Sequence, residues 1–595
     1  MTQTPAAPAD IIAPSRQPAN QAMRTTAASS AGAYVASSMT KCVASNRSVS
    51  CSSSVPLTPS YRSRSLEPSI ECPTQRPGPG DGRPVASTAG CSGERRIARP
   101  SASARTNSSV AGAQCHEYAP ATTSTASPIS RTSGGWSWGG MASDCSNGSG
   151  QTGRSALRRI VIRWWPPRRT LDAARRRIMK LPAHGSTVDD VMARLRSMQG
   201  KDADYHSAKT WGLIYNAGPD VDEMLHAAAN HVLAENALNP FAFPSLRQMQ
   251  GDVVDVAANL LHGGDDVGGT MTSGGTESIF MAVKTARDRM REEKGIRHGR
   301  IIIPRTAHPA FIKAAHLLDL EWVHMPLGDD LRTHAAPLAE MITDNTVLAV
   351  GSAPNYPFGM VDPIPDMAAI ASAAGVPFHV DACLGGFMLP FLERLGHPVP
   401  PWDFRVPGVS SISADVHKYG YAIKGASVIL HRPKANVRHQ IFMFNDWPGG
   451  LYGTLAFLGT KPAPPIAACW SVLQFLGEDG YLRLAKDTLE ATRKLIQGVR
   501  AIDGIHVWGE PDMTVTAIGS HTQDIFAIGD VMNERGWHFD RQEQPNALHL
   551  MASPRHNDVI DEFLDDLRFA VAHHAEKSTK AATYGDDVSA EAAAT

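Results

Sequence analysis

The chain has 595 residues, 42% of them hydrophobic, and its 57 Lys and Arg nearly balance its 58 Asp and Glu. A chain of this length can bury a large core in roughly two to four domains. The near-zero net charge argues against a protein that is basic throughout, and no run approaches the roughly 18 apolar residues of a membrane span. We therefore expect no integral membrane segment.

The average hides two segments of opposite charge. Residues 1–178 hold 22 basic residues, 21 of them Arg, against 8 acidic ones, whereas residues 179–595 hold 35 basic and 50 acidic residues. The first segment is rich in Ser, Thr, Ala, Pro, Gly and Arg and shows no hydrophobic period of two or of 3.6. Such a composition cannot bury enough apolar surface to offset the entropy of ordering. We predict that residues 1–178 are disordered.

Three interpretations of this segment compete. It resembles an organelle-targeting leader in its Ser and Arg content, and its Arg- and Trp-rich stretch at 154–177 resembles a patch for nucleic acid or anionic membranes. Six of the eight cysteines lie here without CxxC pairs or a preceding apolar signal sequence, which argues against a zinc site or a disulfide scaffold. We favour the third interpretation, that Met179 is the true start or the segment is a dispensable tail, because orderly sequence begins near Met179.

From Met179 onward the hydrophobic pattern is that of an α/β protein. Apolar residues at helical spacing predict a helix over 187–198, and short apolar strands then alternate with helical stretches. This alternation predicts a mostly parallel sheet with helices on both faces and a ligand site at the carboxyl ends of its strands. The predicted strands are 300–303, 347–350, 376–380, 410–413 and 426–430, and the predicted helices lie near 276–293, 309–318, 335–343 and 364–374.

The first stretch with chemical content is TSGGTES at 272–278, which precedes a helical pattern. Gly274 and Gly275 let the backbone approach an anion closely, and the helix that begins near Thr276 directs free N–H groups and its positive dipole end toward that anion. The stretch is neither a Walker loop nor a dinucleotide fingerprint. It predicts a phosphate cradle, although such a turn taken alone is more often a structural N-cap.

Two further candidates follow apolar strands. Asp381 in FHVDACLGG ends a strand, where an ionised carboxylate needs a cationic partner such as a protonated pyridine nitrogen, or else caps the next turn. Lys418, beside His417 in SADVHKYG, is a Schiff-base candidate because a partly buried amine loses its proton easily, although a lone lysine is usually a solvated charge.

A histidine completes the set. His308 in TAHPAF precedes Pro309 at the first position of a predicted helix, where an N-cap residue would face the site, although most histidines at such places are structural. Anion turn, histidine, strand-end aspartate and strand-end lysine are together the parts that a pyridoxal 5′-phosphate enzyme needs. The combination predicts that cofactor, and no metal site is expected.

The motifs TSGGTES, AHPAFIKAA, GSAPNYPFGMVDPI, FHVDACLGGF and DFRVPGVSSISADVHKYGYAIKG resemble the sphingosine-1-phosphate lyase family, pyridoxal-phosphate enzymes of fold type I related to group II decarboxylases. The resemblance runs from about Met179 to about Ala575. It implies that Lys418 forms the Schiff base, Asp381 pairs with the ring nitrogen and His308 stacks on the ring. It also implies that the cofactor phosphate is held by Gly274, Gly275, Thr276 and His417.

The resemblance further implies a homodimer with shared active sites. Residues 446–452 and 459–462 match the family loop that reaches the neighbouring subunit, so Tyr452 and Thr460 would complete the partner's site, Thr460 on the cofactor side. The match is loose, because Thr460-Lys461 stands where the family has Ser-Arg and Leu455 replaces a proline. A plain surface loop is the alternative.

The substrate side departs further from the family. Tyr215, Asn236 and Cys383 match substrate-contact or pocket positions, but Asn239 stands where the family has histidine, which removes a cation or proton shuttle. Three functions compete: cleavage of a phosphorylated long-chain amino alcohol to a fatty aldehyde and phosphoethanolamine, decarboxylation of an amino acid, and a non-catalytic scaffold whose basic tail recruits an anionic surface. We favour the lyase, and the joint retention of the cofactor residues argues against the scaffold.

The expected organisation is a helical segment at 179–250, a large cofactor-binding domain at 251–470, a small C-terminal α+β domain at 471–575 that begins with a long helix, and a tail at 576–595. Because no membrane anchor is visible in the sequence, unlike in eukaryotic members of the family, we expect a cytoplasmic enzyme. We expect no nucleic-acid partner for the folded part.

Overall fold

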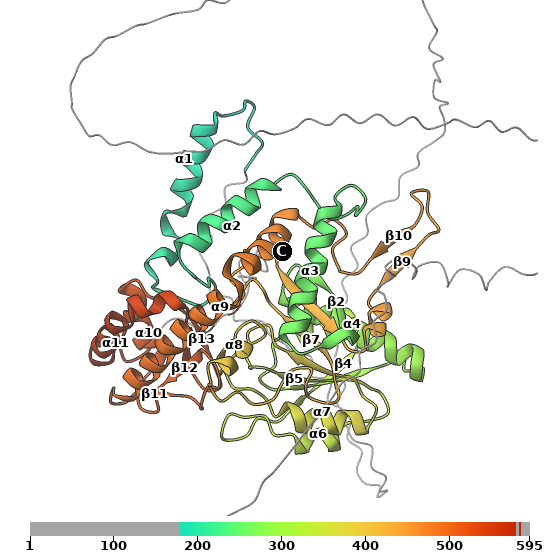
Figure 1. The fold of residues 1–595 in the computed structure, drawn as a ribbon. Helices are drawn as coiled ribbons and strands as arrows, with labels where there is room; N and C mark the ends of the chain where they lie inside the picture. Colours follow the sequence, from blue (N-terminus) through green and yellow to red (C-terminus); the bar gives the residue numbers. More distant parts are fainter. Residues whose placement is uncertain (1–178, 579–581, 583, 585–595) are drawn as a thin grey trace, which may run out of the picture. The chain divides into compact units, whose positions relative to one another are not determined.

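The computed structural model describes residues 179–578, 582 and 584, and the predictions for residues 1–178 lie outside this range (Figure 1). A seven-stranded sheet, a five-stranded sheet and a two-stranded hairpin organise the described residues. Among their helices, none is both long and apolar enough to cross a membrane.

The seven-stranded sheet has the order β2-β8-β7-β6-β5-β3-β4. Strands β4, β3, β5, β6 and β7 run parallel, and β8 runs antiparallel to both β7 and β2. The predicted mostly parallel α/β sheet is confirmed, and five of its strands lie where the sequence predicted them, whereas β2 and β4 were not predicted. The bounds are β2 Gly268–Thr272, β3 Arg300–Pro304, β4 Glu321–Met325, β5 Thr346–Ser352, β6 Phe378–Asp381, β7 Val409–Ala414 and β8 Ser427–His431.

Helices cover both faces of this sheet, as predicted. On β3, Ile301 and Ile303 pack with α4 (Gly275–Lys294) and α5 (Ala310–Leu317), whereas Ile302 belongs to the core on the opposite face with α6 (Ala336–Met341) and α7 (Ile364–Ala373). Because successive side chains of a strand point to opposite faces, this apolar run contributes side chains to the hydrophobic cores on both faces of the sheet. The run therefore reads as a continuous hydrophobic stretch rather than an alternating one.

A five-stranded sheet with the order β1-β13-β14-β12-β11 lies where the sequence predicted a small α+β domain, although its edge strand β1 comes from the segment 179–250 that was predicted to be helical. The long helix α9 (Ala463–Arg500) begins nine residues before the predicted position 472 and kinks at Gly477, where φ is 56°. The other bounds are β1 Thr210–Trp211, β11 His506–Val507, β12 Val515–Gly519, β13 His538–Gln542, β14 Ala547–Met551, α8 Leu389–Arg394, α10 Ile525–Glu534 and α11 Ile560–His573.

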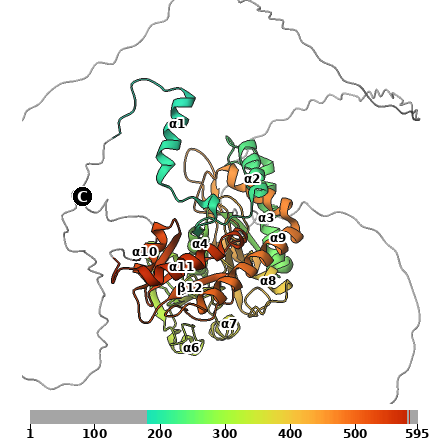
Figure 2. The ribbon, with the colours of Figure 1, turned by 90° about the vertical axis from the view of Figure 1, so that its left-hand side faces the viewer.

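Two elements stand away from these cores. The predicted first helix is confirmed as α1 (Val188–Met198), which buries none of its residues and stands clear of the other helices in Figure 2. It is followed along the chain by α2 (Pro219–His231) and α3 (Pro244–Leu260). The hairpin of β9 (Phe442–Phe444) and β10 (Tyr452–Thr454) also projects (Figure 1). Both elements carry apolar side chains that this single chain leaves exposed.

Tyr419 ties the large sheet to the small domain. Its ring is fully buried, and its hydroxyl donates to the carbonyl of Ala552 at 3.0 Å and accepts from Thr514 Oγ1 at 2.8 Å. Since Thr514 and Ala552 flank paired strands of the small domain, the two hydrogen bonds anchor the turn that follows β7.

Replacing this hydroxyl tests the anchor. We expect Tyr419→Phe to lower the free energy of unfolding by about 1–3 kcal/mol, because a buried hydroxyl and a buried carbonyl each lose a partner. Urea unfolding of the cofactor-free protein measures the change. The matched control is Tyr205→Phe, at a tyrosine that is 37% exposed, which should shift stability by less than about 0.5 kcal/mol. Equal stabilities of the two variants would contradict the anchor.

Candidate active site

The parallel strands end at one edge of the large sheet, and the polar residues gather there. Ser352 on β5, Asp381 on β6 and Ser413 on β7 are direct neighbours in the strand register. Lys418 lies in the turn after β7. A ligand site was expected at this edge, because the carboxyl ends of parallel strands leave a crevice there.

A cavity of about 660 Å³ opens at this edge. It brings together eight of the residues singled out from the sequence: Gly274, Gly275, Thr276, His308, Asp381, Cys383, His417 and Lys418. It is also lined by residues that were not identified from the sequence, among them Glu277, Tyr356, Asp415, Asp540 and Tyr584.

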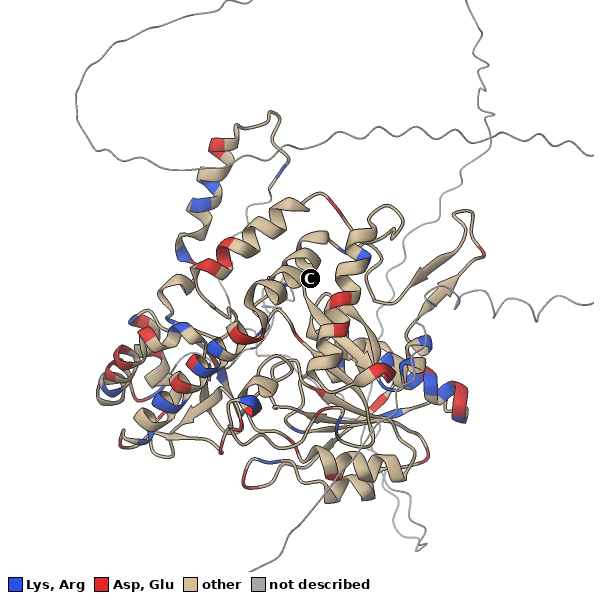
Figure 3. Ribbon diagram, in the orientation of Figure 1, with Lys and Arg blue, Asp and Glu red and all other residues tan. Residues whose placement is uncertain are grey.

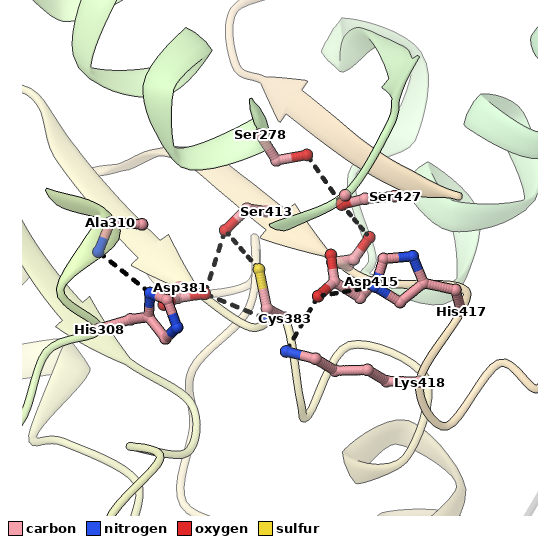
Figure 4. Close-up of polar contacts among 12 residues, drawn as sticks. Ser278, His308, Ala310, Asp381, Cys383, Ser413, Asp415, His417, Lys418 and Ser427 are labelled. Carbon is pink, nitrogen blue, oxygen red and sulfur yellow. Dashed lines mark hydrogen bonds and ion pairs between the residues drawn. The ribbon is translucent and has the colours of Figure 1, made fainter. Parts of the chain in front are cut away.

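Lys418 forms an ion pair inside the cavity wall. Its Nζ lies 3.0 Å from Oδ2 of Asp415, a carboxylate that is 1% exposed (Figure 4). Burial by itself would lower the pKa of Lys418, but Asp415 raises it well above its ordinary value. The expectation that partial burial would make this amine lose its proton easily is therefore wrong for the cofactor-free protein.

Asp415 is held as an anion by the same pair. Burial would raise its pKa, but the charge of Lys418 lowers it below the ordinary value. Its Oδ1 is buried and has no hydrogen-bond partner. Asp415 stands three residues before Lys418 in ADVHK, but nothing in the local sequence pattern distinguished this aspartate from an ordinary turn residue.

Asp381 is fixed by two donors on one oxygen. Its Oδ1 accepts from the backbone N–H of Cys383 at 3.1 Å and from the hydroxyl of Ser413 at 3.2 Å. His379 contacts Ser413 Oγ through Nε2 at 3.2 Å and Ser411 Oγ through Nδ1 at 2.8 Å. Burial lowers the pKa of His379 to about 4, so this ring stays neutral.

His308 is held at the start of α5. Its Nδ1 accepts from the N–H of Ala310 at 3.1 Å, and the cap residue of the helix is Pro309, one position later than predicted. Burial lowers the pKa of the ring, with the Lys418 charge acting in the same direction and Asp381 and Asp415 against it. Its Nε2 lies 3.2 Å from the hydroxyl of Tyr584.

The glycine turn before α4 leaves room for an anion. A Cβ on Gly275 would lie 2.7 Å from Asp415 Oδ2 and 2.9 Å from Cys383 Sγ, so a larger residue would have to displace these two buried side chains. Glu277 fixes the turn, because its carboxylate accepts from the N–H of Ser273 and from the N–H of Phe457, each at 2.6 Å. The first N–H groups of the helix have no intrahelical partner and can serve an anion.

His417 adds a neutral donor beside this turn. Its Nδ1 accepts from the backbone N–H of Ala426 at 3.2 Å and of Gly425 at 3.3 Å, which leaves the ring proton on Nε2. Burial lowers the pKa of His417 to about 4. This Nε2 lies 3.6 Å from Asp415 Oδ2, and a neutral ring with its proton on Nε2 is also suited to donate to a phosphate oxygen.

Four predicted residues lie outside this cavity. Tyr215 donates to Met551 Sδ at 3.2 Å, and its ring lies 4.8 Å from Lys424 Nζ. Asn236 forms an isolated β-bridge with Pro462, next to the exposed Thr460, and Tyr452 lies on the hairpin. Within one chain, Asn236, Tyr452 and Thr460 therefore do not line the cavity with Lys418, whereas Tyr215 lies close enough that it and Lys418 affect each other's pKa.

The arrangement fits pyridoxal 5′-phosphate. It offers an amine, a fixed carboxylate, a glycine turn that a Cβ would fill, a neutral donor and a buried carboxylate oxygen without a partner. Among residues 179–578, 582 and 584, no group of three or more His, Cys, Asp or Glu side chains could hold a metal ion.

Comparisons with known proteins agree with this fit. The conserved domain of pyridoxal-dependent decarboxylases matches residues 208–518. Sphingosine-1-phosphate lyase 1 of Rattus norvegicus is 38% identical over 411 residues, which cover 69% of this chain and 72% of the relative. The Arabidopsis thaliana sphingosine-1-phosphate lyase is 39% identical over 399 residues, 66% of this chain and 73% of the relative.

Solved structures give the same picture. The sphingosine-1-phosphate lyase of Burkholderia pseudomallei is 38% identical, with a TM-score of 0.64 over 67% of this chain and 93% of that chain. Glutamate decarboxylase of Lactobacillus brevis is 20% identical, with a TM-score of 0.59 over 66% of this chain and 94% of that chain, and shares the fold.

The ion pair of Lys418 predicts a pH effect. Without the Asp415 charge, burial dominates and lowers the pKa of Lys418, so Asp415→Asn should let the amine react with pyridoxal phosphate at lower pH than in the wild type. The initial rate of appearance of the visible Schiff-base band, followed from about pH 6 to about pH 10, measures this. Lys418→Ala is the control and should show no band. An unshifted profile in Asp415→Asn would contradict the prediction.

Proposed function

Because the chain belongs to the sphingosine-1-phosphate lyase family of pyridoxal-dependent decarboxylases, we propose that it cleaves the Cα–Cβ bond of a phosphorylated long-chain amino alcohol. The products would be a fatty aldehyde and phosphoethanolamine. The observation that carries the proposal is the cavity lined by Lys418, Asp381 and His308, in a chain 38% identical to a solved lyase and 20% identical to a solved decarboxylase. The curated relatives are enzymes, so a non-catalytic scaffold is not favoured.

The protein is a pyridoxal-phosphate-dependent lyase, and its bound cofactor supplies an electron sink for the bond that breaks at the substrate Cα. We assign to Lys418 the amine that attaches the cofactor. Asp381, with Oδ1 fixed by two donors, is suited to hold a proton at the ring nitrogen. His308 is assigned to the ring face. The phosphate is assigned to the N–H groups of Gly275 and Thr276 and to His417 Nε2–H.

Asp415 has a distinct role beside the lysine. An amine reacts only after it loses a proton, and Asp415 Oδ2 is 3.0 Å from Lys418 Nζ. We propose that this oxygen accepts hydrogen bonds from the Lys418 ammonium before attachment and gives up that partner when the ammonium loses its proton to solvent. A buried carboxylate that exchanges partners in this way keeps the amine in place while the cofactor enters.

The substrate phosphate needs a cation other than the family histidine. Asn239 uses its side chain locally, because Oδ1 accepts from the N–H of Phe241 at 2.9 Å. We propose that Lys424 supplies this cation. Its Nζ donates to the carbonyl of His417 at 3.0 Å and lies over the Tyr215 ring, on the substrate side in the assignment made from the sequence.

A second copy of the chain is proposed to complete the site. The hairpin region 442–457 has one charged residue, Asp446, and Figure 3 shows it largely without charge. A soluble chain rarely leaves such a patch uncovered. The exposed apolar side chains are Phe442, Met443, Phe444, Trp447, Leu451, Leu455 and Phe457 on this region and Val188, Val191, Met192, Leu195 and Met198 on α1.

Product analysis by mass spectrometry tests the reaction. The full chain, loaded with pyridoxal phosphate, is incubated separately with sphingosine 1-phosphate and with a pool of amino acids. We expect a long-chain aldehyde and phosphoethanolamine in the first reaction and no amine in the second. Formation of amines and CO₂ from the amino acids would instead show that the protein is a decarboxylase with a lyase-like fold. Lys418→Ala is the control and should form neither product set.

Mixing variants tests the shared site. We expect Lys418→Ala and Tyr452→Phe to be impaired when each is purified alone, because each would damage both sites of its own homodimer. After subunit exchange, mixed dimers carry one intact site, so an equimolar mixture should recover about a quarter of wild-type activity. A mixture no more active than the mean of the two variants would contradict a tyrosine supplied by the partner.

A further inference from the structure

The C-terminal tail brings a tyrosine into the cofactor cavity. Tyr584, the last described residue, lines this cavity with Lys418 and His308 although it follows α11 and the small domain. Its hydroxyl lies 3.2 Å from His308 Nε2, and the two rings meet edge to face, with centroids 5.7 Å apart. From the sequence, residues 576–595 were assigned to a tail without chemistry.

Two earlier residues of the tail are held against the small domain. Ser578 donates from its N–H to Asp524 Oδ2 at 3.1 Å and from its hydroxyl to Asp530 Oδ2 at 2.6 Å. Ala582 packs on the core cluster of that domain. The contacts of Ser578 and Ala582 with the small domain therefore both support the position of Tyr584 at the cavity.

Aromatic neighbours hold the Tyr584 ring. Its centroid lies 5.1 Å from that of Tyr356, whose hydroxyl donates to Asp540 Oδ2 at 2.9 Å. On its other side Tyr356 stacks on His549, with centroids 4.1 Å apart. Tyr584 thus links the packed rings of His549 and Tyr356 to the ring of His308.

Both ring nitrogens of His308 have partners in this arrangement. Nδ1 accepts from the Ala310 N–H, so the neutral ring carries its proton on Nε2 and donates it to the Tyr584 hydroxyl. An imidazole held at both nitrogens keeps its plane, whereas one held only at Nδ1 can tilt about that bond.

We propose that Tyr584 is a positioning residue, which orients the His308 ring against the cofactor through the hydrogen bond to Nε2. The inference rests on the proposed place of His308 on the cofactor ring. Tyr584 acts through His308 and is not assigned a step in bond cleavage.

The test uses the full-length protein loaded with pyridoxal phosphate and two readouts other than activity. These are the dissociation constant of the cofactor, from titration of the cofactor-free protein, and the circular dichroism of the bound cofactor, which reports the orientation of its surroundings. We expect Tyr584→Phe to weaken cofactor binding about two- to tenfold, the net worth of one hydrogen bond, and to change the dichroic band. The matched control Tyr205→Phe should change neither readout.

Companion variants separate this inference from the function on which it rests. His308→Ala should change both readouts, and Tyr584→Phe should add almost nothing in the His308→Ala background, because a residue that acts through another is not additive with it. An equal effect of Tyr584→Phe in both backgrounds would overturn the inference. Unchanged readouts in Tyr584→Phe alone would overturn it while leaving His308 in place. Unchanged readouts in His308→Ala would remove the proposed role of His308, and with it that of Tyr584.

Discussion

The parallel pairing of β5, β6 and β7 is the constraint on which the rest of the site depends. It makes Ser352, Asp381 and Ser413 direct neighbours, and Ser413 then donates to the carboxylate of Asp381. A slip of one residue would turn every side chain of β6 to the other face and place Asp381 against a packed helix. The buried apolar residues on both faces of these strands exclude that slip, so hydrophobic packing fixes the position of a charge.

The electrostatics of the cavity favour chemistry over stability. Taking Lys418 and Asp415 out of water costs free energy that their attraction only partly returns, and one oxygen of Asp415 remains without a hydrogen-bond partner. A pair of apolar side chains would serve the fold equally well. His417 lies 3.6 Å from Asp415 Oδ2 but stays neutral, as does His379, so Lys418 is the positively charged partner of Asp415.

The sequence predicted the helices and strands that have a clear hydrophobic pattern, and it predicted the polar residues that directly follow the strands. Strands such as 300–303 were found because they are continuous apolar runs, and Asp381 and Lys418 were found because each follows such a run. β2 was missed because its sequence, GGTMT, has no apolar run, and the burial of its last three residues comes from packing that only the fold supplies. Tyr584 was missed for a similar reason, since no local pattern links a tail to a strand end. The protonation of Lys418 was misjudged because burial was weighed without the charge of Asp415.

The departures from the family pattern lie outside the cavity that holds Lys418. The side chain of Asn239 accepts a hydrogen bond within its own turn. The neighbouring Asn236 forms a β-bridge with Pro462, which lies next to Thr460 and Lys461 in the chain. If Thr460 reaches the partner's cavity in the proposed dimer, cofactor chemistry and part of substrate recognition would rest on different surfaces of one chain. A substitution on the second surface can then change which substrate group is held without disturbing the register of β6 and β7. This separation explains why the cofactor residues match the family closely while the substrate side has diverged.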